Sequence, residues 1–186
     1  MNMNTLIQKL RNQGVTFTNG LSDLEVVEIQ SRYEITFPPD LKTFLQTALP
    51  ISSSFVDWRN SNPNHVKKIQ SVLTAPLEGI IFDIKHNDFW HDDWGTKPLD
   101  QQLAIEICSR YVHQAPTLIP IYSHRYIPSS PDQQGNPVFS VYQTDIIYYG
   151  ANIIQYLLIE FGLKKYIEVN DEPIEYIPFW SDLVGY

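Results

Sequence analysis

The residues best suited to chemistry in this chain gather between Gly79 and Gly95, in the stretch GIIFDIKHNDFWHDDWG. Its polar and aromatic members are Asp83, His86, Asp88, Trp90, His91, Asp92, Asp93 and Trp94. The carboxylates and imidazoles could bind a divalent ion, because oxygen and nitrogen donors are what such ions take from proteins. The same carboxylates could instead meet lysine and arginine side chains of another protein, with a tryptophan as the central anchor.

Three interpretations of this stretch stay open. For a metal site, the spacing of His86 and His91 fits neither an EF-hand loop nor the two-histidine helical zinc motif. As a structural loop, Phe89 and Trp90 would anchor the chain while the acids stay in water or cap a turn. As a partner-binding surface, the acids and Trp94 would face a basic protein, and this interpretation is compatible with the structural one.

A smaller constellation follows at Asp57, Trp58 and Arg59. Trp58 is typical of a core or rim aromatic, and Asp57 with Arg59 is expected to form a local ion pair of little energetic weight. Asp57 and Trp58 are therefore outer candidates for a partner surface. Carbohydrate stacking on the tryptophans would require exposed and roughly coplanar rings.

No set of residues indicates catalysis. The chain has no G-x-S-x-G elbow, no P-loop and no dinucleotide glycine pattern. His124-Arg125 precedes Tyr126 rather than the aspartate of a kinase catalytic loop. Cys108 falls on a helical repeat, which favours a buried thiol over a nucleophile. We predict no catalytic residue, no bound metal and no cofactor.

Composition narrows the class of protein. The 186 residues are 43% hydrophobic and 18% charged, which indicates a folded globule rather than a disordered chain. The formal net charge of −8 argues against a general nucleic-acid binder, since such a protein needs a basic face. It favours a basic protein partner, because summed charge steers association. The single cysteine excludes an internal disulfide.

The expected location is the cytoplasm, without contact to a membrane. The first residues, MNMNTLIQKLRNQG, lack the regions of a signal peptide. No apolar run approaches the roughly 20 residues that span a bilayer.

Local patterns predict helices in the first half of the chain. Leu6, Ile7 and Leu10 recur at helical spacing before Gly14. Ser22 and Glu25 match a capping box. A third helix should begin at Pro38-Pro39 and end before Pro50, and a fourth should begin at Asn64 and end at Pro76. GIIFDI, rich in β-branched residues, predicts a strand.

The second half mixes helices and strands. Asp100 precedes a helix whose inward residues should be Leu103, Ala104, Ile107 and Tyr111. TLIPIYSH and PVFSVYQTDIIYYG predict strands, with a reversal at residues 143–145, and Asn152 should cap another helix. The tail YIPFWSDLV is apolar enough to dock on the body. Helices flanking an antiparallel sheet place residues 1–186 in the α+β class, as one domain.

The order of several segments resembles the SUKH superfamily, which includes the yeast cell-wall assembly regulator. These segments are YEITFPPDLKTFL, DWRN, PLEGIIFDIKHNDFWHDDWG, APTLIPIYSHRYIP and GNPVFSVYQTDIIYYG. The resemblance covers roughly residues 21–161. It implies a non-enzymatic domain with a curved, mainly antiparallel sheet and helices packed around it.

Many bacterial members of that superfamily are immunity proteins, so the resemblance implies direct binding to a toxin. A cell-envelope regulator or scaffold is the alternative, and a metal-dependent hydrolase using His86 and His91 is a third. We take the immunity protein as the working hypothesis, with a basic nuclease-type toxin domain as the partner. Its predicted contact residues are Asp83, Asp88, Trp90, Asp92, Asp93 and Trp94, with Asp57 and Trp58 outside them.

Overall fold

The computed structural model describes residues 1–185, apart from the side chains of residues 168, 170 and 171. Its α-helices are α1 (Met3–Asn12), α2 (Asp23–Tyr33), α3 (Pro39–Thr47), α4 (Pro63–His86), α5 (Gln101–Gln114) and α6 (Ile153–Glu160). Its 3-10 helices are η1 (Asp92–Trp94) and η2 (Tyr166–Asp171). Its strands are β1 (Phe17–Asn19), β2 (Ala48–Pro50), β3 (Leu118–Tyr122), β4 (Arg125–Pro128), β5 (Val138–Tyr142) and β6 (Asp145–Gly150).

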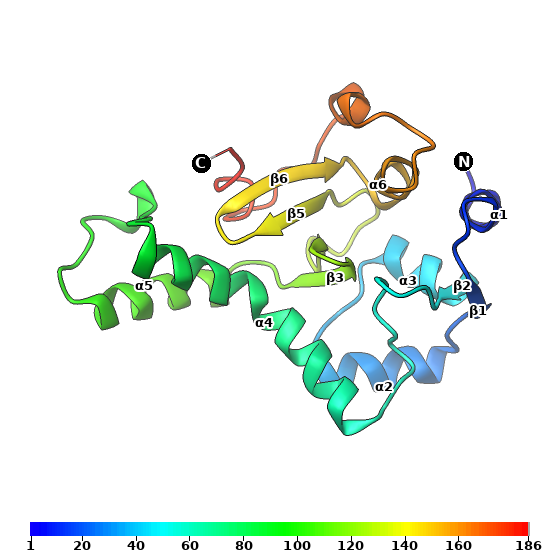
Figure 1. The fold of residues 1–186 in the computed structure, drawn as a ribbon, viewed down its shortest axis with the longest axis horizontal. Coiled ribbons are helices and arrows are strands. Elements are labelled where there is room, and N and C mark those ends of the chain that lie inside the picture. Colours follow the sequence, from blue (N-terminus) through cyan, green and yellow to red (C-terminus); the bar gives the residue numbers. More distant parts are fainter. Residues whose placement is uncertain (186) are drawn as a thin grey trace.

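Strands β3 to β6 form an antiparallel sheet in chain order, and β1 pairs with β2 in a separate antiparallel ribbon. Figure 1 shows α1, α2 and α3 at one end of the molecule and α5 at the other, with α4 running between them below the sheet. Helices thus surround an antiparallel sheet, and the predicted α+β class is confirmed.

Two hydrophobic clusters lie on opposite faces of this sheet. Neighbouring strand residues point to opposite faces, and Tyr126 and Ile127 belong to different clusters, as do Val138 and Phe139. One cluster joins α1, α2, α3 and α6, whereas the other joins α5, the second half of α4 and the C-terminal tail. The sheet therefore packs against a separate hydrophobic core on each of its two faces.

The predicted capping box of α2 is confirmed. The backbone N–H of Glu25 donates to Ser22 Oγ at 3.2 Å, and Ser22 N–H donates to Glu25 Oε2 at 2.8 Å. Glu25 also accepts a hydrogen bond from Arg59 Nε at 2.6 Å. The expected ion pair of Asp57 with Arg59 is therefore wrong: Arg59 reaches back to the start of α2, which joins segment 57–60 to that helix.

The hydrogen bond from Arg59, with those from Ser22, lowers the pKa of Glu25 from 4.5 to about 2. Because the folded-state pKa lies below the unfolded value, the stabilisation is complete above pH 4.5 and is lost as pH falls toward 2. We expect Glu25→Gln to lower the free energy of unfolding at pH 7, and the difference from the wild type to vanish near pH 2. Urea unfolding at four pH values measures it, with Glu28→Gln, exposed on the same helix, as the control. An equal loss at pH 7 and pH 2 would contradict the assignment.

The prediction that the fourth helix ends at Pro76 is wrong. Helix α4 continues through this proline to His86. A proline inside a helix removes one N–H donor and leaves the carbonyl four residues earlier without its partner. Here that carbonyl belongs to Val72, and it accepts a hydrogen bond from the hydroxyl of Tyr126 at 3.1 Å. Burial raises the pKa of Tyr126 to about 12, so this donor keeps its proton. A side chain from β4 therefore replaces the missing helix bond.

The strand predicted at GIIFDI is also wrong, because these residues form the last turns of α4. Ile80, Asp83 and Ile84 are buried and lie three and four residues apart, which is helical rather than strand spacing. Gly79 is required where α4 crosses the β5–β6 turn, because a Cβ there would lie 2.8 Å from Gln143 Cα. The predicted start at Asn64 is likewise two residues late, since Asn62 caps the helix.

Other local predictions hold in most respects. Helix α1, the helix cap at Asn152 and the β5–β6 reversal are confirmed, and the tail docks through buried Ile177, Trp180 and Leu183. In α5, Ala104 and Cys108 are buried, but Leu103 is 46% exposed and Tyr111 is 37% exposed, contrary to expectation. Strand β4 was not predicted, because its four residues stand within a turn-rich segment.

Candidate functional site

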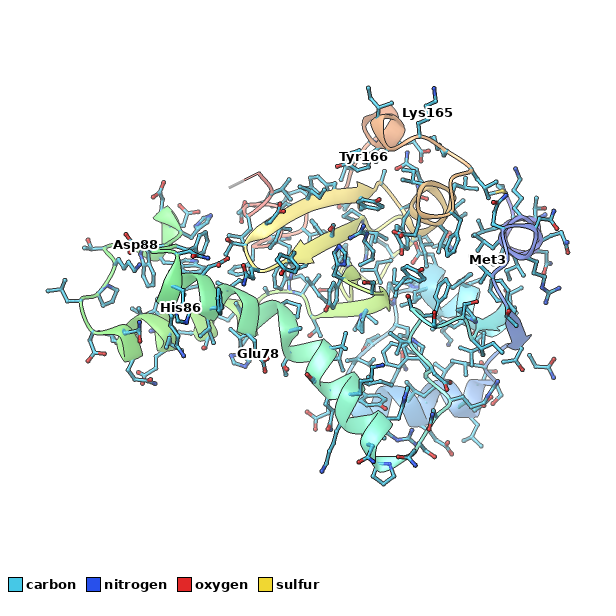
Figure 2. All side chains as sticks on the ribbon, in the orientation of Figure 1. Met3, Glu78, His86, Asp88, Lys165 and Tyr166 are labelled. Atoms are coloured by element: carbon cyan, nitrogen blue, oxygen red, sulfur yellow. The ribbon has the colours of Figure 1, made fainter. Side chains whose placement is uncertain are left out.

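The second half of α4, segment 87–100 and α5 form a projection that we call the α4–α5 arm. It extends away from the sheet to the left end of the molecule in Figure 1. Buried Ile80 and Ile84 of α4 and Ala104 and Cys108 of α5 belong to one hydrophobic cluster, so the two helices share a core. Figure 2 shows the side chains of His86 and Asp88 at the outer part of this arm. Most of the predicted contact residues therefore lie on one protruding element.

The tip of the arm is a structured loop, as one of the three interpretations expected. Asp88 has a φ of 56°, and Phe89 N–H donates to the carbonyl of Asp83 at 3.1 Å, which ends α4. Trp90 Nε1 donates to the carbonyl of Gly95 at 2.7 Å and closes the loop over η1. The carboxylate of Asp100 then accepts the N–H groups of Gln102 and Leu103 and begins α5.

Three of the predicted carboxylates face water. Asp88, Asp92 and Asp93 are exposed, and the side chain of Asp88 is 95% accessible. Lys97 forms an ion pair with Asp88, and this hydrogen bond holds the pKa of Asp88 below its usual value. Because such an exposed pair contributes little free energy, a cation of another protein can replace Lys97 at small cost.

Asp83, the remaining predicted carboxylate of segment 79–95, is not on the surface. It is 3% exposed and accepts hydrogen bonds from Thr144 N–H at 2.9 Å, Thr144 Oγ at 2.6 Å and Asn87 Nδ2 at 2.5 Å. These bonds join α4 to the β5–β6 turn. Asp83 therefore positions the arm on the sheet, and the assignment of Asp83 to a partner surface is contradicted by its burial.

Trp94 is buried as well, with 7% of its surface exposed. Its ring stacks on Tyr111 of α5 and on Phe179 of the tail, at centroid distances of 5.7 Å and 6.2 Å. Trp90 meets it edge-on at 5.2 Å and is itself partly exposed. Trp94 thus anchors the loop to the body, and its burial contradicts its assignment as the central anchor on a partner.

Exposed apolar side chains stand beside the carboxylates, and sequence reasoning missed them. Leu99 is fully exposed, and Phe82 and Leu103 are nearly half exposed. Leu99 borders a groove that Asp88 and Lys97 also line. The available signal was Leu99 itself, an apolar residue between Pro98 and Asp100 where a loop was expected. Exposed apolar side chains on one protrusion favour a protein-binding surface, and the carboxylates around them would form its polar rim.

The two outer candidates, Asp57 and Trp58, lie outside the α4–α5 arm. Trp58 is 1% exposed and packs edge-on against Tyr33 and Phe37, so it belongs to the core of the N-terminal helices. Asp57 is partly buried, and its carbonyl is 3.0 Å from His65 Nε2. Neither residue lies on the α4–α5 arm, and Trp58 offers no ring face to a partner or a sugar.

The two histidines of the arm do not converge. His86 is exposed on the last turn of α4 with its ring 4.5 Å from that of Phe82. His91 is buried, and its Nδ1 accepts the N–H of Asp93 at 3.3 Å. Within residues 1–185, the described side chains include no group of three or more His, Cys, Asp or Glu arranged to hold a metal ion.

Cys108 and Arg125, the other potentially reactive groups, lie in the packed interior or in an ion pair. Cys108 is completely buried, and burial raises the pKa of its thiol to about 12, so the nucleophilic thiolate is strongly disfavoured. Arg125 pairs with Glu160 at 3.2 Å and covers the ring of Tyr149 at 3.8 Å. The sequence His124-Arg125-Tyr126 therefore belongs to the start of β4 and its packing.

No helix in the described part of the chain is both long enough and apolar enough to cross a membrane. Comparison with protein-family models, with curated proteins and with solved structures finds no match to this chain.

Proposed function

We propose that this protein is a non-enzymatic binding protein that covers a basic surface of another protein with its α4–α5 arm. In the form that the SUKH resemblance implies, it is a cytoplasmic immunity protein, and the partner is a nuclease-type toxin domain. Binding would occlude the toxin's substrate groove and compete with nucleic acid for the same cationic side chains.

One observation carries this proposal. The arm presents exposed Asp88, Asp92 and Asp93 beside exposed Leu99 on a protrusion that the buried Asp83 and Trp94 hold to the body. A loop that is already ordered loses little entropy on binding, so its contacts contribute more fully to affinity. Exposed carboxylates raise the association rate with a basic partner by electrostatic steering.

The test is a variant in which Asp88, Asp92 and Asp93 are all replaced with asparagine. We expect association with the purified product of the adjacent gene to be about tenfold slower, with a shallower dependence on salt, because exposed charges act mainly on the association rate. Biolayer interferometry at several salt concentrations measures both quantities.

A matched control places the same change of charge elsewhere. Glu28, Glu78 and Asp132 are exposed carboxylates outside the arm's tip. Their triple replacement with Gln, Gln and Asn should leave association nearly unchanged. Equal effects of the two triple variants, or no binding of the wild type to that gene product, would refute the proposal.

A further inference from the structure

A small pocket lies at the base of the arm's tip, between η1, α5 and the C-terminal tail. It has a volume of about 160 Å³, and its lining includes Trp94, Tyr111, Phe179 and Leu183. Pockets for whole small-molecule ligands run from about 300 to 1,000 Å³. This space therefore suits a single side chain better than a metabolite or a sugar.

Aromatic rings form the walls of this pocket. Trp94 lies within 19° of parallel to Tyr111 and within 8° of parallel to Phe179. These stacked neighbours leave Trp94 only 7% exposed, whereas Tyr111 is 37% exposed and offers accessible ring surface. The faces of such rings attract cations, and the planar guanidinium of arginine stacks on them especially well.

Two carboxylates stand at the same pocket, Asp93 of η1 and Asp182 of the tail. The side chain of Asp93 is 84% accessible. Asp182 is held in place by the N–H of Phe179, which donates to it at 3.0 Å, and by the hydroxyl of Tyr176. Residues 93 and 182 are far apart in sequence, so only the docking of the tail brings the two acids to one opening.

Few basic groups of this chain lie at the pocket. Among the described side chains that line it there is no lysine or arginine. Arg110 lines the neighbouring hollow, on which Trp94 and Tyr111 also border. His91 is the one basic side chain of the described lining: its Nδ1 accepts the N–H of Asp93 at 3.3 Å and lies 4.0 Å from Asp93 Oδ2.

We propose that this pocket receives an arginine side chain of the protein partner, whose guanidinium packs on the exposed ring of Tyr111, next to Trp94, and meets Asp93 and Asp182. The inference rests on the proposed function and names the group on the partner that the arm recognises. Charge complementarity and the ring faces favour this occupant. A neutral side chain would not complement the charge of the two carboxylates.

The test uses the full-length protein and Nα-acetyl-arginine amide as the probe, with the matching citrulline amide as a neutral ligand of the same shape. NMR spectroscopy follows the indole N–H signals of Trp94 and Trp58, the latter in the other core. We expect millimolar concentrations of the arginine amide to shift the Trp94 signal and leave that of Trp58 unchanged. Equal shifts with the citrulline amide, or no shift of Trp94, would overturn the proposal.

Two single variants separate a pocket from general electrostatics. Asp93→Asn and Asp92→Asn remove the same charge from adjacent exposed positions, but only Asp93 lines the pocket. We expect Asp93→Asn to weaken binding of the arginine amide about fivefold, as for a partly desolvated cation site, and Asp92→Asn to change it little. An equal loss in both variants would overturn the proposal.

The outcome for this pocket is distinguishable from the outcome for the proposed function. The protein could bind the adjacent gene product through its tip carboxylates and yet show no arginine-specific shift of the Trp94 signal. That result would refute the arginine pocket and leave the proposed function standing. Arginine-specific binding at Trp94, without association with that gene product, would support the pocket and refute the immunity function.

Discussion

Replacing Trp58 with alanine is expected to lower the free energy of unfolding by about 4 kcal/mol, since removal of a buried tryptophan leaves a large cavity. Trp58 is 1% exposed, and its ring centroid lies 5.8 Å from that of Tyr33 and 5.1 Å from that of Phe37. The melting temperature should fall by about 10 °C in a protein of this size.

Urea unfolding and thermal melting measure this loss. Trp58→Phe retains part of the ring and should cost less than half as much. Tyr142→Ala, at a side chain that is 66% exposed, serves as the control and should stay within about 0.5 kcal/mol of the wild type. If Trp58→Ala retains wild-type stability, the packing of the N-terminal helices around this residue is wrong.

The second large effect is expected at Asp83. In Asp83→Ala, the N–H and hydroxyl of Thr144 lose their acceptor in a partly buried site, whereas the exposed amide of Asn87 can bind water instead. An unpaired buried group costs about 1–3 kcal/mol, and for the two partly buried donors of Thr144 we expect a net loss of about 2 kcal/mol. Asp83→Asn keeps one oxygen acceptor and should cost about 1 kcal/mol.

Denaturant titration of Asp83→Ala, Asp83→Asn and Asp92→Ala provides the comparison. Asp92 is an exposed carboxylate in the same arm, so Asp92→Ala should change stability by less than about 0.5 kcal/mol. A destabilised Asp83→Ala that is still folded should also show faster hydrogen exchange in the last turns of α4. Equal stability of Asp83→Ala and Asp92→Ala would contradict the anchoring role.

Short-range signals in the sequence predicted their elements well. The Ser22–Glu25 capping box, the cap at Asn152 and the apolar spacing of Leu6, Ile7 and Leu10 all appear as expected. Each of these depends on groups within four residues of one another. Such local hydrogen bonds and periodicities are encoded in the chain itself.

The errors in α4 arose where a distant residue decides the local structure. Pro76 predicts a helix end because the carbonyl of Val72 loses its helical N–H partner. The hydroxyl of Tyr126, fifty residues after Pro76, donates to that carbonyl instead, so the helix continues. The short apolar run at GIIFDI is compatible with a strand or a helix, and periodicity over so few residues does not separate the two. The Asp83 bonds to Thr144 are equally remote in sequence.

In the candidate site too, local features could be predicted from the sequence and long-range ones could not. Composition and residue types indicated an acidic, aromatic segment, and Asp88, Asp92 and Asp93 of that segment are exposed. Residue types alone did not distinguish these acids from the buried Asp83, nor anticipate that the tail would bring Asp182 beside Asp93. Burial and proximity follow from packing between elements far apart in the chain, so these features emerge only when the whole chain is folded.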